Sequence, residues 1–390
     1  MRCLFFKKAI FCLTKGCEYG KIGLCKYLHK TLFVSEGKIL AVGVSSLKDV
    51  AQAANVSVPT ASRILRKINL TRFSEETRNK VWDAAAKLRY RPNMLVKGIQ
   101  TGTTHTIGVM VPPFDSYWSS ILYGIHDTLI TVDFVPINLW VRHGDNFSSS
   151  GPVDDLEQIH RLIDRRIDGV IMWPPITPDF YAHNEELTSR NVPVLTIDHE
   201  LPPEFGADSI TTNEEHGAQL VAKHLLDLGH RRIAHLGDVG LETYSWAQRR
   251  RMFFEKEIAA VPGASCFAVE KRKNADGLEL AKKILTADPR PTAVYAASDL
   301  LARYVYLAAA ELKLRIPENV SVVGFADLDF AAYMMPPLTS VRQKGYEVGR
   351  RAAKLLIDRI QGKFAQNGIQ SIVMNCELVV RGSTAPAAKQ

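Results

Sequence analysis

The residues with the clearest chemical purpose lie in the short run Ser57–Arg66, which reads SVPTASRILR. The guanidinium of Arg63 can donate two hydrogen bonds to one guanine edge in the DNA major groove, and Val58 and Pro59 can contact a thymine methyl group. Hydroxyl and basic neighbours suit phosphate contacts, which position a protein on the duplex without reading its sequence. The candidate DNA-contacting residues of this run are Ser57, Val58, Pro59, Thr60, Ser62, Arg63 and Arg66.

Two short helices joined by a tight turn would present this run to DNA. Asn55 tolerates the left-handed backbone that a tight turn needs, Ser57 can cap the second helix, and Pro59 falls in its first turn, where a missing N–H costs little. The buried stripe of the first helix, at helical spacing, is Leu47, Val50, Ala51 and Ala54, and that of the second is Ala61, Ile64 and Leu65. The spacing predicts a helix-turn-helix, whose second helix enters the major groove.

A third helix completes the small unit. Ser74 caps it, Glu75 and Glu76 favour its positive end, and Pro92 stops it. Its expected inner stripe is Val81, Ala85 and Leu88.

Charge is distributed unevenly along the chain. The formal charge is +8 overall, and it divides into +6 for residues 1–44, +7 for residues 45–104 and −5 for residues 105–390. A basic unit joined to a mildly acidic body suits phosphate neutralisation, in which Lys and Arg release condensed counterions. The alternative is a solvated basic face, which the helical pattern makes less favoured.

The cysteines and the first 44 residues indicate a reducing cytoplasm and no membrane anchor. No CxxC pair occurs among Cys3, Cys12, Cys17, Cys25, Cys266 and Cys376, so neither a zinc module nor a disulfide framework is supported. No apolar run approaches the ~18 residues of a membrane span. Lys7 and Lys8 interrupt the first apolar stretch, so it makes a poor signal peptide. We interpret residues 1–44 as an extension outside the fold, disordered or translated from a start assigned too early; a basic or redox-active arm is the alternative.

From residue 105 the pattern changes to short apolar strands that alternate with helices. The expected strands are TIGVMV (106–111), DFVPINLWV (133–141), DGVIMW (168–173), VPVLTID (192–198), RIAHLGD (232–238), TAVYAAS (292–298) and VSVVGF (320–325). Helical runs between them include Asp154–Arg166, Glu215–Leu228 and Leu300–Leu312. Such alternation predicts parallel sheets covered on both faces, and the number of strands favours two lobes. Ligands of such folds bind beyond the carboxyl ends of the strands.

The run DVAxxAxVSxxTxSRxL, followed by SEETRxKVxxAxxxLxYRPN, resembles the headpiece of the lactose/galactose/purine repressor family. The similarity continues over about residues 46–385 through DGVI (168–171), HLLDLGHRRIAHLG (224–237), AVYAASD (293–299), IPENVSVVGFAD (316–327) and PPLTSV (336–341). The resemblance implies a homodimer that binds a pseudo-palindromic operator, under control of a small molecule held in a periplasmic-binding-protein-like core.

The resemblance also implies a hinge helix after Asn93 that enters the minor groove, with Lys97 near DNA and Ile99 as the apolar wedge. Seven residues that include a glycine cannot hold a helix alone, so we expect this hinge to order only on DNA. The chain departs from the family pattern in three places: Arg66 replaces an Asn, Val96 replaces an Ala, and the loop Lys67–Phe73 is longer. These departures affect operator sequence and hinge geometry.

Matched one by one to the family pocket, the expected effector-binding residues are Tyr117, Trp118, Asp198, Tyr244, Trp246, Arg250, Ser298, Asp299 and Asp327. Ala326 occupies a place where some relatives use an acid. An arginine offers planar recognition of hydroxyls or a carboxylate, and aromatic rings suit a pyranose face, which favours a carbohydrate effector. For Trp118 and Trp246 ordinary packing is the alternative, and for Asp198 and Asp299 it is helix capping. Because three arginines are adjacent, the match to Arg250 can slip by one.

We therefore expect an α/β protein with four parts. These are the extension 1–44, a helix-turn-helix domain 45–93, a hinge and linker 94–104, and a core 105–390 with lobe 1 at about 105–204 plus 335–368 and lobe 2 at about 205–334 plus 369–385. A sugar-binding transport component is the alternative for the core, but the missing signal peptide and the DNA-binding unit argue against it. We expect no enzyme, catalytic residue, metal or cofactor, since GxGxxG, P-loop, GxSxG and HExxH motifs are all absent.

Overall fold

The structure, a computed structural model, describes residues 34–35, 38–39, 45–92, 98, 102–112, 115–140, 155–174, 178–238, 245–272, 275–364 and 368–387. The chain forms two compact units, Met1–Asn93 and Met94–Gln390, and each is described by itself. Within the first unit, the two-residue strands β1 (Val34–Ser35) and β2 (Lys38–Ile39) pair antiparallel. None of the helices in the described part of the chain combines the length and the apolar content that crossing a membrane requires.

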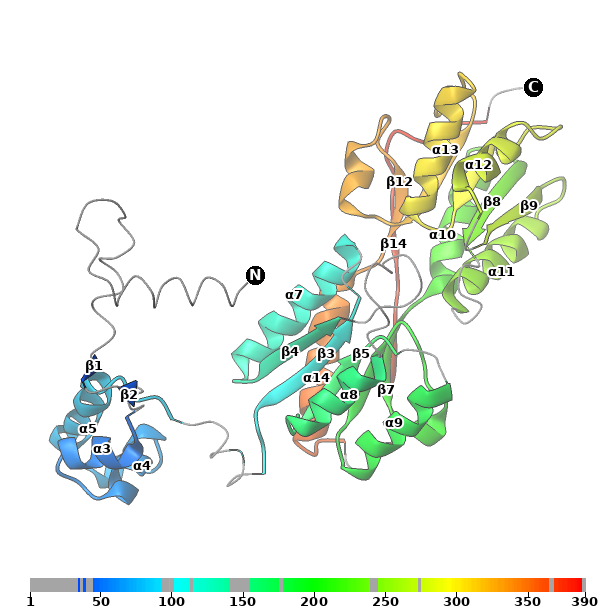
Figure 1. Cartoon of the computed structure of the whole chain (residues 1–390). Coiled ribbons are helices and arrows are strands. Elements are labelled where there is room, and N and C mark those ends of the chain that lie inside the picture. Colours follow the sequence, from blue (N-terminus) through cyan, green and yellow to red (C-terminus); the bar gives the residue numbers. More distant parts are fainter. Residues whose placement is uncertain are drawn as a thin grey trace, which may run out of the picture. The chain divides into compact units, whose positions relative to one another are not determined.

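The first unit contains the three helices expected from the sequence, α3 (Leu47–Ala53), α4 (Val58–Leu65) and α5 (Glu75–Lys87) (Figure 1). Each begins after a serine whose hydroxyl accepts a backbone N–H of the first turn, namely Ser46, Ser57 and Ser74. The turn between α3 and α4 places Asn55 at φ 54°, the left-handed conformation predicted for it. The fully buried core is small: Val50, Ala51, Ala54, Ala61, Ile64, Val81 and Ala84. Ala85 and Leu88, expected at the centre of the third stripe, are only partly buried.

The second unit contains two six-stranded sheets, so the predicted α/β class with two lobes is confirmed (Figure 1). The first sheet is parallel throughout, in the order β13-β7-β6-β5-β3-β4. Its strands are β3 (Thr106–Val111), β4 (Val135–Trp140), β5 (Gly169–Met172), β6 (Val194–Ile197), β7 (Asp208–Thr212) and β13 (Ser371–Met374). Apolar side chains of α7 (Ser116–Thr131) and α14 (Gly345–Ile360) form the core on one face, and those of α8 (Asp155–Asp164) and α9 (Pro178–Ser189) on the other.

The second sheet has the order β14-β12-β11-β10-β8-β9, with only the edge strand β14 antiparallel. Its strands are β8 (Arg232–Asp238), β9 (Ser265–Lys271), β10 (Ala293–Ala296), β11 (Ser321–Ala326), β12 (Thr339–Arg342) and β14 (Glu377–Val379). Helices α10 (Glu214–Asp227) and α11 (Ser245–Ala259) cover one face, and α12 (Gly277–Leu285) and α13 (Asp299–Glu311) cover the other. Two short 3-10 turns, η3 (Pro203–Phe205) and η4 (Asp329–Tyr333), complete this unit, and η1 (Leu70–Arg72) belongs to the first.

The chain passes between the two sheets three times: after β7, after β12 and after β13. Each passage falls a few residues later than the lobe boundaries expected from the sequence. Side chains tie the passages together, because Gln343 donates to the Thr212 hydroxyl over 2.9 Å and Asn213 donates to the Asn375 side chain over 2.8 Å. All three connecting segments are thus held together near the carboxyl ends of β7 and β13.

Candidate DNA-binding helix and ligand cavity

Helix α4 presents the predicted base-reading residues to solvent. Ala61 and Ile64 point into the small core, so Val58, Pro59 and Arg63 lie on the opposite, exposed side of the helix. Val58 is 40% exposed, so its side chain is accessible to a partner. This geometry fits insertion of the amino-terminal half of α4 into a major groove.

The expected phosphate contacts divide into two kinds. Arg66 is exposed at the end of α4, whereas Thr60 and Ser62 are half-buried. The Ser57 hydroxyl accepts the Thr60 N–H over 3.2 Å and hydrogen-bonds the Thr60 hydroxyl over 2.8 Å. Ser57 therefore caps the helix, as predicted, and its hydroxyl also holds that of Thr60. The remaining expected DNA contacts, Asn93, Lys97 and Ile99, lie outside the described residues.

A cavity of about 350 Å³ lies in the second unit, at the carboxyl ends of β6 and β7. Its lining comes from both lobes, since β6 and β7 belong to the first sheet while α10 and α11 cover the second. The lining residues are Asp198, His199, Glu200, Thr211, Thr212, Glu214, Trp246 and Arg249. Two of the expected effector-binding residues, Asp198 and Trp246, are among them. A site lined by both lobes can respond to a change in the angle between them.

Asp198 is held in place by a hydrogen-bonded network beside this cavity. Its backbone is left-handed, at φ 52°, and its carboxylate accepts the Tyr117 hydroxyl over 2.6 Å. The other carboxylate oxygen accepts both the amide and the hydroxyl of Thr212 at 3.0 Å. Burial raises the pKa of Asp198 and, together with the nearby carboxylate, that of Tyr117. Tyr117 thus acts here through Asp198 rather than by lining the cavity.

Arg250 does not line the cavity but lies behind it, in an ion pair with Glu214. The guanidinium donates to the two carboxylate oxygens over 2.6 and 3.1 Å and to the Ala297 carbonyl over 2.8 Å. Both side chains are only 6% exposed. The neighbouring Arg249 lines the cavity instead.

Sequence reasoning missed Glu214. It is the first residue of α10 and is followed by Glu215, so it fits the usual acidic first turn of a helix. Nothing local distinguishes it from a dipole-stabilising surface residue. Its partner is 36 positions away in the sequence.

The aromatic candidates separate into packing and lining residues. Trp118 is buried, with its ring 5.4 Å from those of Tyr117 and of Trp173 between centroids, and all three belong to the core of the first lobe. Trp246 is half-buried, lines the cavity and lies 4.5 Å from the Arg250 guanidinium. Tyr244, the other aromatic candidate, lies outside the described residues.

Three other expected residues are not in the cavity lining. Ser298 caps a helix, whereas Asp299 and Asp327 organise the loop after β11. The Ser298 hydroxyl caps α13 by accepting the Leu301 N–H. Asp299 is fully buried and accepts the Leu328 N–H over 2.7 Å and the Ser340 hydroxyl over 2.6 Å. Asp327, with φ 50°, forms ion pairs of 2.7 Å with Arg342 and with Arg381.

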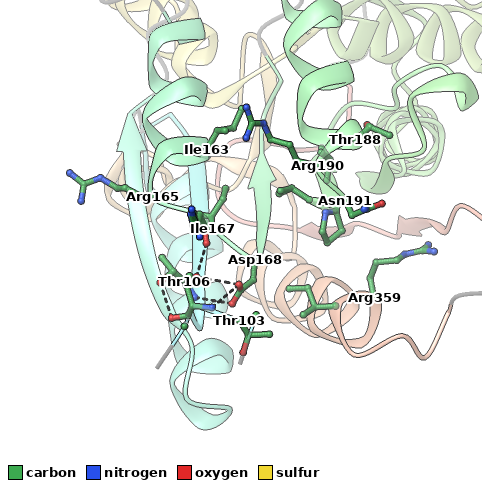
Figure 2. Close-up of a pocket in the computed structure, with 18 of the residues that line it drawn as sticks. Thr103, Thr106, Ile163, Arg165, Ile167, Asp168, Thr188, Arg190, Asn191 and Arg359 are labelled. Carbon is green, nitrogen blue, oxygen red and sulfur yellow. Dashed lines mark hydrogen bonds between the residues drawn. The ribbon is translucent and has the colours of Figure 1, made fainter. Parts of the chain in front are cut away.

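A second, larger hollow of 1190 Å³ lies at the opposite, amino-terminal end of the first sheet (Figure 2). Asp168 is turned towards Thr103 and Thr106 there, and its carboxylate accepts the Thr104 and Thr106 amides over 2.8 and 3.3 Å. Two of its arginines are already paired, Arg190 with Glu186 and Arg359 with Asp208. Ligands of parallel sheets bind at the carboxyl ends of the strands, which is where the smaller cavity lies.

Comparisons with known proteins agree with this division. The family profile "Bacterial regulatory proteins, lacI family" matches residues 46–93, and "Periplasmic binding protein-like domain" matches residues 222–384. The HTH-type transcriptional repressor CytR of Escherichia coli (strain K12) is 30% identical over 349 residues, which cover 87% of this chain and 96% of that protein.

Two solved structures are similar over nearly the whole chain. The lac repressor dimer bound to operator and the anti-inducer ONPF superposes with a TM-score of 0.74 at 27% identity, covering 88% of this chain and 100% of that one. The transcriptional regulator CelR–cellobiose complex has a TM-score of 0.62 at 25% identity and covers 87% of this chain and 99% of that one.

Asp299→Asn should flatten the pH dependence of stability between about pH 4 and pH 7. Burial raises the pKa of Asp299 from 3.8 to about 7, so within that window the folded chain keeps a proton that the unfolded chain releases. The free energy of unfolding of the wild type should therefore fall as the pH rises through the window, by up to about 4 kcal/mol from this one group. Urea denaturation at a series of pH values measures it. Asp329→Asn, at an exposed position, should keep the wild-type slope; an unchanged slope in Asp299→Asn would contradict the raised pKa.

Proposed function

The chain belongs to the lacI family of bacterial regulatory proteins and is a DNA-binding transcriptional repressor controlled by an effector, and from this we propose that the effector is a carbohydrate bound in the 350 Å³ cavity. The relatives are repressors, so the expectation that the chain is not an enzyme is confirmed. The proposed partners are a pseudo-palindromic operator and a second copy of the chain, and the proposed location is the cytoplasm, with the nucleoid.

The lining of the cavity supports a carbohydrate. Carboxylates, threonine hydroxyls and the Arg249 guanidinium offer both acceptors and donors to sugar hydroxyls, and the Trp246 ring offers a flat apolar face to a pyranose. A similar regulator has been solved as a cellobiose complex. We propose Asp198 and Trp246 as direct contacts, with Tyr117 positioning Asp198. Arg250, Ser298, Asp299 and Asp327 stay in the proposal as residues that hold the site and the adjoining loop.

We propose the following division of the chain into domains. Residues 45–93 form the DNA-binding domain, 94–104 the hinge and linker, and 105–390 the effector-binding core, with 1–44 as an extension. A hinge that orders on DNA, with Ile99 as its wedge, would connect the angle between the lobes to the spacing of two headpieces.

Two apolar surfaces suit the homodimer. Tyr123 and Ile130, seven residues apart on α7, are each 68% exposed, and Val135, on the edge strand β4, is 62% exposed. The second lobe exposes Tyr333 and Met335 by 83% and 86%. Large aliphatic and aromatic side chains left this exposed mark interaction surfaces.

Arg63→Ala should strongly reduce discrimination between operator and random duplex while leaving weaker, salt-sensitive binding. The lost bidentate contact to a base is worth about 1–3 kcal/mol of specificity. Footprinting and fluorescence anisotropy on both duplexes measure the ratio of affinities. Arg66→Ala is the matched control: it should weaken both affinities together, since a phosphate contact carries no sequence information. Unchanged specificity in Arg63→Ala would refute its base-reading role.

A panel of sugars and glycosides should contain a compound that raises the unfolding temperature, because a ligand specific to the folded state stabilises it by mass action. Trp246→Ala should weaken binding of that compound about tenfold, a loss of ~1.4 kcal/mol. Trp82→Ala, on the exposed face of α5, is the control and should leave its affinity unchanged. If no sugar binds and another class of compound does, the carbohydrate assignment fails.

Ile130→Glu should convert the dimer to a monomer, because a carboxylate would be buried without a partner at the interface. Light scattering after gel filtration measures the mass, and the operator affinity should fall with it. Val373→Glu is the control: Val373 is 54% exposed on β13, at the opposite edge of the same sheet. A dimer that persists in Ile130→Glu would rule out α7 as the interface.

A further inference from the structure

Glu214 occupies the side of the Arg250 guanidinium that a ligand would otherwise bind. The side-on edge of the Arg250 guanidinium, formed by Nε and one terminal nitrogen, is bound to the Glu214 carboxylate, and the other terminal nitrogen donates to Ala297. Its faces are covered too, by Phe325 at 3.5 Å and Trp246 at 4.5 Å from the ring centroids. The edge with which arginine binds carboxylates and phosphates is therefore already filled by an anion of the protein itself.

The charges around the cavity reinforce this effect. Among the described lining residues, Asp198, Glu200 and Glu214 bring carboxylates, whereas Arg249 alone brings a permanent positive charge. Burial lowers the pKa of His199, so its ring adds no charge at pH 7. An anionic ligand would place a further negative charge beside the buried Glu214 carboxylate, from which water is largely excluded.

From these contacts we infer that Glu214 determines effector specificity: it acts as an internal anion on Arg250, so that the cavity accepts uncharged or ammonium-bearing hydroxylated ligands and rejects phosphorylated and carboxylated ones. The inference rests on the proposed effector site. It narrows the expected effectors to one chemical class: neutral sugars and amino sugars can bind, whereas sugar phosphates and sugar acids cannot. An anion could reach the Arg250 edge only by displacing Glu214 from both nitrogens, or when Glu214 is protonated.

Inorganic phosphate tests the inference without knowledge of the effector. The full-length chain is unfolded thermally with and without millimolar phosphate, with sodium chloride keeping the ionic strength constant. The wild type should show no phosphate-dependent shift. Glu214→Gln, which keeps the shape but removes the charge, should release the Arg250 edge, and saturating phosphate should raise its unfolding temperature by about 3 °C or more.

Two controls isolate the arginine. Glu215→Gln removes the same charge one residue further along α10, away from Arg250, and should behave as the wild type. Adding Arg250→Met to Glu214→Gln should remove the response to phosphate. A wild type that phosphate stabilises as much as Glu214→Gln, or a folded Glu214→Gln that does not respond, would overturn the inference.

Should Glu214→Gln fail to fold, the wild type and two other variants still decide the matter. Phosphate stabilisation of the wild type that is lost in Arg250→Met would show an available arginine and refute the internal anion. An unresponsive wild type, together with a phosphate response in the smaller Glu214→Ser, supports it. The sugar panel is separate: if no sugar binds but the phosphate results hold, the carbohydrate proposal fails while the role of Glu214 stands.

Discussion

The buried ion pair between Glu214 and Arg250 is the interaction on which the second unit depends. Each charge is almost wholly removed from water, which is tolerated only because both carboxylate oxygens, three nitrogens and both faces of the guanidinium have partners. Glu214 begins α10, directly after the first passage between the sheets, and Arg250 comes from α11. The pair therefore joins α10, where the chain enters the second lobe, to α11. Both helices contribute residues to the cavity lining.

A hydrogen-bonded chain links the same cavity to the connections between the lobes. Asp198 accepts from Thr212, and the Thr212 hydroxyl accepts in turn from Gln343 in the second passage. A ligand that contacts Asp198 would thus act one side chain away from the segments that connect the lobes. Control of DNA binding requires only that the ligand favour one lobe arrangement over the other, because that difference in affinity is what shifts the equilibrium.

The sequence analysis missed the strands that come directly before a passage between the lobes and most of those at the edges of the sheets. β7 reads DSITT and is completely buried, although its polar residues gave no strand pattern and none was expected there. Its hydroxyls are satisfied by neighbours distant in sequence, as in the bond between Ser209 and Ser371. β12 (TSVR) and β14 (ELV) are short and carry polar or charged residues, unlike the equally short apolar strands β5 and β10, which were expected. The polar character of such strands becomes intelligible only when their partners are known.

The sequence by itself determined the helix-turn-helix, the serine caps Ser57 and Ser74, the left-handed turn at Asn55 and the alternation of strands and helices in the body. These features depend on contacts between residues a few positions apart, which a single chain displays directly. The tertiary structure alone decided that Arg250 faces Glu214, that Arg249 faces the cavity, and that Asp299 is buried against Ser340. Those pairings join residues from different strands and helices, and their charge states follow from burial, a property that no local spacing encodes.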